Sequence, residues 1–227
     1  MMPSAWTSWC DRRHRQSECR FRHGAPPLAS GGPHAGARID VFRARFRGPG
    51  GTAAERHFLN AASFGLGAVA ALGVRGWCRA VPGSARYLAA AIPALASGRS
   101  FRVTLCLDDS FSATFDITTA AVANGQYQGG GIRIAPEAAI DDGLADITVV
   151  ERVSLAEIVA NLPILYSGAL YSHRKVRHWR AARVHAEAET EVPVELDGEP
   201  VGTLPLDVEV LPQALRFILP PLRQAGR

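Results

Sequence analysis

Cysteine is scarce in this chain of 227 residues, and its four cysteines include no C-x-x-C pair. A disulfide scaffold and a zinc finger are therefore not expected. Long apolar runs are also missing, because the most apolar stretch, 61–74, is short and contains three glycines. A membrane-spanning helix needs about 20 apolar residues, and the basic N-terminus lacks the apolar segment of a signal peptide. These absences predict a cytoplasmic protein and leave peripheral association with a membrane open.

Familiar catalytic signatures are absent as well. The segment Ser63-Phe64-Gly65 is not part of a G-x-S-x-G motif, and H-E-x-x-H does not occur. The glycines at 129–131 lack the Lys and Ser/Thr of a phosphate-binding loop. We expect these glycines to form a wide loop between strands, and the sequence shows no self-contained catalytic centre.

Basic charge is concentrated at the N-terminus. Residues 1–38 contain six Arg against two acidic residues, and this excess equals the net charge of +4 of the whole chain. The remaining residues carry 19 basic and 19 acidic side chains. The folded part therefore has no charge excess for a polyanion, and nucleic acid is not an expected partner.

Composition divides the chain into a tail and a domain. Residues 1–37 combine Arg, His, Ser, Gly and Pro without apolar periodicity. Such a segment cannot bury enough apolar surface to offset its ordering entropy. We predict that 1–37 is a disordered tail or an artefact of a misplaced start or shifted frame. The folded domain is expected over 38–222, followed by a short tail at 223–227.

Strand and turn patterns dominate residues 38–222. Alternation predicts one hairpin from 39–47 and 57–62, and a second from 101–107 and 111–122. Two helices are expected, at 84–97 and from the capping box of Ser154 and Glu157 to about Leu170. The predicted fold class is α+β, mainly β: an antiparallel two-layer β-sandwich with two helices. Further strands are predicted at 131–134, 145–151, 176–189, 191–196, 201–210 and 214–219.

Two acidic turns are the candidate functional sites. The segments Asp141-Asp142-Gly143 and Asp197-Gly198-Glu199 each fall between predicted strands, where their side chains can face solvent or a cleft. Asp-Gly is also common in tight turns for backbone reasons alone, because glycine readily adopts positive φ. Taken alone, each turn is better explained by backbone geometry than by function.

Four segments in a fixed order carry a family resemblance: FLNAASFG at 58–65, ANGQYQGGGIRIAP at 123–136, IDDGLAD at 140–146 and LDGEP at 196–200. Together they resemble successive motifs of the bacterial diacylglycerol kinases and sphingosine kinase-like lipid kinases. The resemblance covers about residues 39–219 and is to the C-terminal domain of that family, a β-rich sandwich that carries the lipid site. Members of the family also have a nucleotide-binding domain with a G-G-D-G-T motif, and nothing similar precedes Arg38.

The resemblance implies a role for each acidic turn. Glu199 corresponds to the general base that takes the proton from the lipid hydroxyl, and Asp197 assists through the hydrogen-bonded water and metal network. Asp142 corresponds to a Mg²⁺ ligand, with the backbone carbonyls of Ala139 and Leu144 as neighbours. Oxygen donors suit a hard cation, and a carboxylate within hydrogen-bond reach of an alcohol can accept its proton.

The resemblance thus implies the acceptor domain of an ATP- and Mg²⁺-dependent kinase for diacylglycerol or a related lipid. ATP would be a co-substrate only when a nucleotide-binding domain is supplied, for example by a separate chain, and the domain is expected to be inactive alone. The alternative is a non-catalytic lipid-binding or regulatory module derived from such a kinase. The basic segment 171–183 could meet an anionic membrane, but its alternation favours a strand with a solvated charged face.

Overall fold

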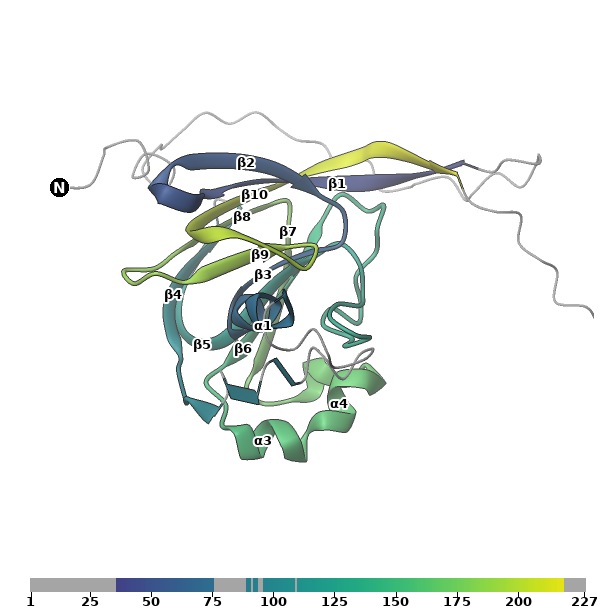
Figure 1. Cartoon of the computed structure of the whole chain (residues 1–227). Coiled ribbons are helices and arrows are strands. Elements are labelled where there is room, and N and C mark those ends of the chain that lie inside the picture. The colour runs from purple at the N-terminus through teal and green to yellow at the C-terminus, as the bar shows by residue number, and fades with distance from the viewer. Residues whose placement is uncertain (1–35, 76–88, 91, 94–95, 109, 219–227) are drawn as a thin grey trace, which may run out of the picture. The chain divides into compact units, whose positions relative to one another are not determined.

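The computed structural model describes residues 36–75, 89–90, 92–93, 96–108 and 110–218 (Figure 1). Within them, Arg38–Arg216 forms one compact unit. The predicted tails at 1–37 and 223–227 lie outside the described residues, apart from residues 36 and 37. Most of the predicted helix at 84–97 lies outside them too, and its described residues 89–90, 92–93 and 96 are helical.

A ten-stranded, mainly antiparallel sheet makes up most of the described chain. This confirms the predicted fold class, in which β structure dominates. In chain order the strands are β1 (Gly36–Arg47), β2 (Ala53–Phe58), β3 (Ala61–Gly65), β4 (Phe101–Leu107), β5 (Phe111–Ala123), β6 (Ala145–Glu151), β7 (Val176–Ala181), β8 (Arg183–Glu187), β9 (Pro193–Leu196) and β10 (Glu199–Ile218).

Six of these strands close on themselves. Each pairs with the next in the order β10, β8, β4, β5, β3 and β9, and β9 pairs again with β10. β10 can close the circuit because residues 199–203 pair with β9 whereas residues 206–209 pair with β8. β1 and β2 extend the sheet from β10, and β6 and β7 branch from β5 (Figure 1). The sandwich is therefore one continuous sheet.

The core forms from alternate residues of the strands, because successive side chains of a strand point to opposite faces. In β4, Phe101, Val103 and Leu105 are buried, whereas Arg102 is exposed and Thr104 is half-buried. β3 differs, because all five of its residues are buried. A strand covered on both faces has no alternation, and its small residues allow neighbouring elements to approach closely.

Besides the helical residues between 89 and 96, the sheet is accompanied by the short α-helices α1 (Leu66–Arg75), α3 (Leu155–Ala160) and α4 (Leu162–Ser167). Two 3-10 turns, η1 (Pro49–Gly51) and η3 (Leu170–Ser172), complete the list. The capping box is confirmed, since Ser154 and Glu157 each accept a hydrogen bond from the other's backbone N–H. The predicted helix from Ser154 to Leu170 breaks at Asn161 into α3 and α4. Pro163 has no backbone N–H to continue the hydrogen bonds of α3, and it lies in the first turn of α4, where none is needed. None of the described helices is long and apolar enough to cross a membrane.

α1 lies in the apolar stretch 61–74, where the sequence predicts no helix. Its glycines lower the intrinsic helix propensity. A Cβ at Gly67 would lie 2.9 Å from the side-chain oxygens of both Ser63 and Thr119, so a larger residue would push the helix away from the sheet. The close packing of α1 against β3 and β5 requires the glycine and overrides its low propensity.

Several predicted strand boundaries are wrong. The strand predicted at 57–62 is instead the end of β2 and the start of β3, and the strand at 176–189 divides into β7 and β8. The division falls where Asp108 Oδ1 accepts hydrogen bonds from the N–H groups of Ala182 and Arg183, at 3.1 and 2.9 Å. The strands predicted at 201–210 and 214–219 join in β10, whose last residue is Ile218.

The glycine run at 129–131 is a loop, as predicted. Its three residues have φ values of +50°, +80° and +93°, a region that glycine adopts at little cost. The strand predicted at 131–134 is wrong, because this segment forms only an isolated bridge between Gln128 and Ile132.

A buried carboxylate at Asp40 ties three segments together. Asp40 is fully buried, and its two oxygens accept hydrogen bonds from the N–H groups of Gly143 and Gln213, each at 2.7 Å. Its own N–H donates to the carbonyl of Ile140 at 2.7 Å. Asp40 therefore fixes the Asp141-Asp142-Gly143 turn against β1 and β10.

We predict that Asp40→Ala lowers the free energy of unfolding by about 3 kcal/mol, because two backbone donors lose their acceptor. Chemical denaturation of the purified chain measures this change. The matched control is Asp116→Ala on the exposed face of β5, which should change stability by less than about 0.5 kcal/mol. Equal losses in the two variants would contradict the role given to Asp40.

Candidate functional site

Asp197 lies in the tight turn between β9 and β10. Its carboxylate accepts hydrogen bonds from three consecutive backbone N–H groups, of Leu59, Asn60 and Ala61, at 2.9, 2.9 and 3.0 Å. These three hydrogen bonds connect the turn to the segment that leads into β3. The geometry gives Asp197 a positioning task, since three amides occupy its oxygens.

Glu199 is the first residue of β10 and pairs with Leu196 across the turn. Its side chain is 55% exposed, and its Oε2 lies 3.6 Å from Nη1 of Arg56. An exposed ion pair of this length contributes little to stability. The carboxylate can therefore reach a molecule that binds over the turn.

Asn124 and Gly125 link the two acidic turns. The amide Nδ2 of Asn124 donates to the carbonyls of Asp40 and Leu59, at 3.1 and 2.9 Å. Asp40 holds the turn at Asp142, and Asp197 holds Leu59, so this almost fully buried amide connects both networks. A Cβ at Gly125 would lie 2.3 Å from Oδ1 of Asn60, so a larger residue would displace the Asn60 side chain, which donates to the carbonyl of Tyr127.

Asp142 is the predicted metal ligand. Its Oδ1 accepts a hydrogen bond from the N–H of Leu144 at 3.1 Å, and its Oδ2 contacts the guanidinium of Arg180. The part of the chain that the structure describes contains no group of three His, Cys, Asp or Glu side chains that could hold a metal ion. An ion here would depend on Asp142 together with the backbone carbonyls of Ala139 and Leu144, and Arg180 would have to move away.

Asp146 offers Arg180 an alternative partner. Its carboxylate is 2% exposed, its Oδ2 makes no hydrogen bond in the described chain, and the Nε of Arg180 lies 3.6 Å from that oxygen. Burial, with a smaller contribution from the negative charge of Glu137, raises the pKa of Asp146 to about 6. The oxygens of this set suit Mg²⁺, and Arg180 can release Asp142 by turning towards Asp146.

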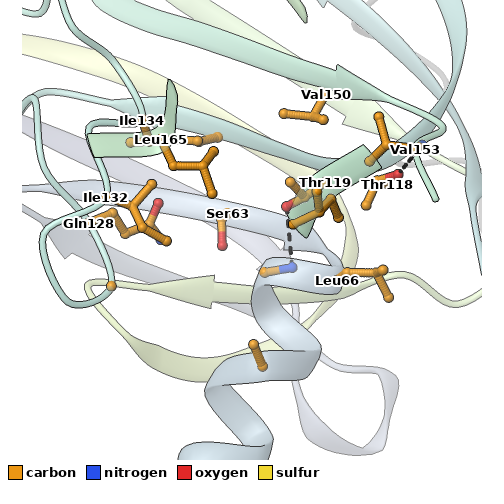
Figure 2. Close-up of a pocket in the computed structure, with 15 residues that line it drawn as sticks. Ser63, Leu66, Thr118, Thr119, Gln128, Ile132, Ile134, Val150, Val153 and Leu165 are labelled. Atoms are coloured by element: carbon orange, nitrogen blue, oxygen red, sulfur yellow. Dashed lines mark hydrogen bonds between the residues drawn. The ribbon is translucent and has the colours of Figure 1, made fainter. Parts of the chain in front are cut away.

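An apolar pocket of about 180 Å³ opens beside β3, β5 and the helices α1, α3 and α4 (Figure 2). Aliphatic side chains form most of its wall. An apolar pocket of this size can enclose six or seven carbons of a longer hydrocarbon chain, since a cavity of about 150 Å³ holds benzene. The residues that line it are Ser63, Leu66, Gly67, Ala70, Thr118, Thr119, Ala121, Gln128, Gly129, Ile132, Ile134, Val150, Val153, Ile158 and Leu165.

Glu195 is a residue that the sequence analysis does not single out. It is fully buried in β9, and its Oε1 accepts hydrogen bonds from Ser63 Oγ, at 2.7 Å, and from Gln128 Nε2. Its Oε2 has no hydrogen-bond partner in the described chain. Burial raises the pKa of Glu195 to about 7. The sequence does contain a signal for a buried acid, because Glu195 is an acidic residue inside the apolar run from Val192 to Leu196.

Three basic residues of the segment 171–183, Lys175, Arg177 and Arg180, form ion pairs with carboxylates. Lys175 lies 2.6 Å from Glu157, and Arg177 lies 2.8 Å from Glu151. Arg180 contacts Asp142, as described above. These ion pairs favour the interpretation of 171–183 as a solvated charged face.

We predict that Glu195→Gln stabilises the protein at neutral and alkaline pH. Folding raises the pKa of this acid from 4.5 to about 7, so the stability of the native protein falls as the pH rises through that interval. The glutamine does not titrate and keeps an oxygen for Ser63 and Gln128. Its advantage in unfolding free energy should widen by about 3 kcal/mol from pH 4.5 to pH 8, as denaturation at several pH values would measure. The exposed control Glu191→Gln should show no such widening, and a constant difference for Glu195→Gln would contradict the prediction.

Comparison with known proteins identifies the family. The family model described as "YegS C-terminal NAD kinase beta sandwich-like domain" matches residues 60–219. The chain is 29% identical over 185 residues to a "Probable lipid kinase YegS-like" of Shewanella frigidimarina, covering 81% of this chain and 56% of the relative. It is 32% identical over 138 residues to a "Diacylglycerol kinase" of Mycobacterium tuberculosis, covering 61% of this chain and 44% of the relative.

The fold is similar to a solved structure of a diacylglycerol kinase from Bacillus anthracis, with a TM-score of 0.53 and 22% identity over 82% of this chain and 55% of that one. The chain spans about half the length of the curated relatives it matches. The match of the family model covers well over half of the chain. This protein therefore belongs to the family of the YegS C-terminal β-sandwich domain, the C-terminal domain of YegS-like and diacylglycerol kinase-like lipid kinases.

Proposed function

We propose that this domain binds the lipid and accepts the proton in a kinase that phosphorylates a hydroxyl of diacylglycerol or a related lipid. ATP is the phosphoryl donor and is bound by a nucleotide-binding domain. The Mycobacterium tuberculosis relative is named a diacylglycerol kinase, which supports diacylglycerol as the acceptor. Because the acceptor is a lipid, the proposal includes peripheral contact with a membrane surface.

One observation carries this proposal: β9 connects the apolar pocket to the carboxylate turn. Glu195 in β9 holds two residues that line the pocket, Ser63 and Gln128. The next residue, Leu196, pairs with Glu199, and residues paired across antiparallel strands lie about 5 Å apart. The backbone of β9 thus leads from two residues that line the pocket to the turn that carries the exposed carboxylate of Glu199, and the proposal has the lipid extend along this path from its hydrocarbon chain to its hydroxyl.

The proposed chemistry uses Glu199 as the general base. The lipid oxygen attacks the γ-phosphorus, the bond from that phosphorus to the bridging oxygen breaks, ADP leaves, and Glu199 takes the hydroxyl proton. When bound, Mg²⁺ neutralises negative charge near the transferred phosphoryl group. Asp197 acts as a positioning residue, because its three backbone hydrogen bonds fix the turn that carries Glu199.

The proposal assigns a structural Mg²⁺, close to the cleft, to Asp142 with the carbonyls of Ala139 and Leu144. The oxygen donors of these residues suit a hard cation, and the orphaned oxygen of Asp146 gives Arg180 a second place to bind. Ion binding at Asp142 then favours the ionised form of Asp146, because the guanidinium moves towards it.

The role of Glu199 is tested in a two-domain enzyme, in which this chain is joined to the part of the Shewanella frigidimarina relative that it does not match. Glu199→Gln should lower the rate of diacylglycerol phosphorylation by about 100-fold or more. The melting temperature should stay nearly unchanged, because the side chain is exposed. Glu191→Gln, at another exposed position, should keep full activity. Full activity of Glu199→Gln would refute the assignment. Lipid binding without phosphoryl transfer in the unsubstituted fusion would favour the alternative of a lipid-binding module.

The metal assignment makes a separate prediction about stability. Millimolar Mg²⁺ should raise the melting temperature of the chain, because an ion that binds only the folded state stabilises it. Asp142→Asn should remove this increase, whereas Asp141→Asn in the same turn should retain it. Scanning calorimetry with Mg²⁺ and with a chelator gives the comparison. A Mg²⁺ effect that survives in Asp142→Asn would exclude Asp142 as the ligand.

A further inference from the structure

The polar side chains that line the apolar pocket differ in how many of their hydrogen-bonding groups are already bonded to the protein. Thr118 Oγ1 donates to the carbonyl of Glu151 and accepts from the N–H of Val153, at 3.2 and 3.0 Å. Thr119 Oγ1 donates to the carbonyl of Phe64 and accepts from the N–H of Gly67, both at 3.2 Å. Both hydroxyl groups therefore serve the fold.

Ser63 and Gln128 form a polar patch in the wall of the pocket. Each donates one hydrogen bond to Oε1 of Glu195, which lies behind the pocket wall. The Ser63 oxygen can still accept a hydrogen bond, and the Gln128 amide keeps its oxygen and one N–H. Figure 2 shows Ser63 and Gln128 among the aliphatic residues of the wall. A ligand that fills the pocket would place its first polar group against these two side chains.

The charge of Glu195 is poorly compensated. β3 and residues 66–73 of α1, which pack against β9, contain no ionisable side chain. The charged residues next to β9 are both acidic: Asp197, held by three amides, and Glu199, 3.6 Å from Arg56. An ionised Glu195 would thus be stabilised by hydrogen bonds from Ser63, Gln128 and the backbone of Gly198, with no cation beside it among these elements.

We propose that Glu195, acting through Ser63 and Gln128, makes the pocket select an acyl ligand whose first polar group is neutral and reject one whose first polar group is anionic. Glu195 is a specificity-determining residue that touches the ligand only through these two side chains. The inference rests on the proposed function, because it specifies which lipids the acceptor site can take.

Physical chemistry gives the size of the effect. Two like charges about 8 Å apart repel each other by about 2 kcal/mol at an effective dielectric constant of about 20. This repulsion weakens the binding of an anionic ligand by about tenfold or more, since about 1.4 kcal/mol corresponds to a factor of ten. A hydroxyl or ester group carries no charge and avoids the penalty. It can also hydrogen-bond to Ser63 and Gln128.

The experiment compares octanol with octanesulfonate, which have the same chain length and differ in charge. The sulfonate stays anionic at every pH used, so its own titration does not affect the result. Isothermal titration calorimetry of the full chain at about pH 8 should show that Glu195→Gln tightens octanesulfonate binding by about tenfold. Octanol binding should change by less than about twofold, and the exposed control Glu191→Gln should change neither ligand.

A second measurement separates this role from a merely structural one. In the unsubstituted chain, octanesulfonate should bind more tightly at about pH 6 than at about pH 8, because Glu195 takes up a proton in that interval. Octanol binding should stay constant, and the Glu195→Gln variant should show no pH dependence for either ligand. An octanesulfonate affinity that does not change with pH, or that is the same in both forms, would overturn the proposal.

A pair of variants on α3 tests whether the ligand occupies this pocket. Ile158 lines the pocket, and the adjacent Val159 is 57% exposed. Ile158→Trp should fill the pocket and abolish octanol binding, whereas Val159→Trp should retain it. Octanol that fails to bind the unsubstituted chain, or that binds Ile158→Trp as tightly, would also overturn the proposal. These assays detect binding alone, so they can fail or succeed independently of phosphoryl transfer in the two-domain enzyme.

Discussion

The pairing of β10 with strands on both of its sides is the constraint on which the rest of the structure depends. Its first residues pair with β9 and its middle residues pair with β8, which closes the circuit of six strands. The chain passes close to itself here, because a Cβ at Gly202 would lie 2.0 Å from the carbonyl oxygen of Arg47. Closure places β9 between β3 and β10, and so brings Glu195 next to Ser63 of the pocket wall and Glu199 to the turn that follows β9.

Polar side chains then organise the loops at the acidic turns. The carboxylates of Asp40 and Asp197 accept hydrogen bonds from backbone N–H groups, and the amide of Asn124 donates to backbone carbonyls. The segments that these bonds join are far apart in the sequence. A buried carboxylate or amide that loses its partners is expensive, so these bonds favour a single arrangement of the loops. Two sites that the resemblance assigns to different tasks, Asp142 and Glu199, thereby belong to one connected framework.

Among the residues that the structure describes, two buried carboxylates retain an oxygen without a hydrogen bond, and both lie near proposed binding positions. Asp146 lies beside Arg180 and the proposed metal position, and Glu195 lies behind Ser63 and Gln128 of the pocket wall. In each case burial raises the pKa towards neutrality. A fold that served stability alone would gain from apolar residues at such positions, which makes a binding function the more economical explanation of both.

Local signals in the sequence determined the strand β1, the hairpin of β4 and β5, the strand β6, the capping box of α3 and the glycine loop at 129–131, but not the bounds of β2. Each depends on residues close together in the chain, where alternation, capping and positive φ act directly. The order of four motifs also indicated the family and the residues Asp142, Asp197 and Glu199. Tertiary structure decided the helix α1, the division of 176–189 into two strands, and the buried positions of Asp40 and Glu195. These features depend on contacts between residues more than 50 positions apart, such as Gly67 with Thr119 and Ser63 with Glu195, and periodicity along the chain carries no information about such contacts.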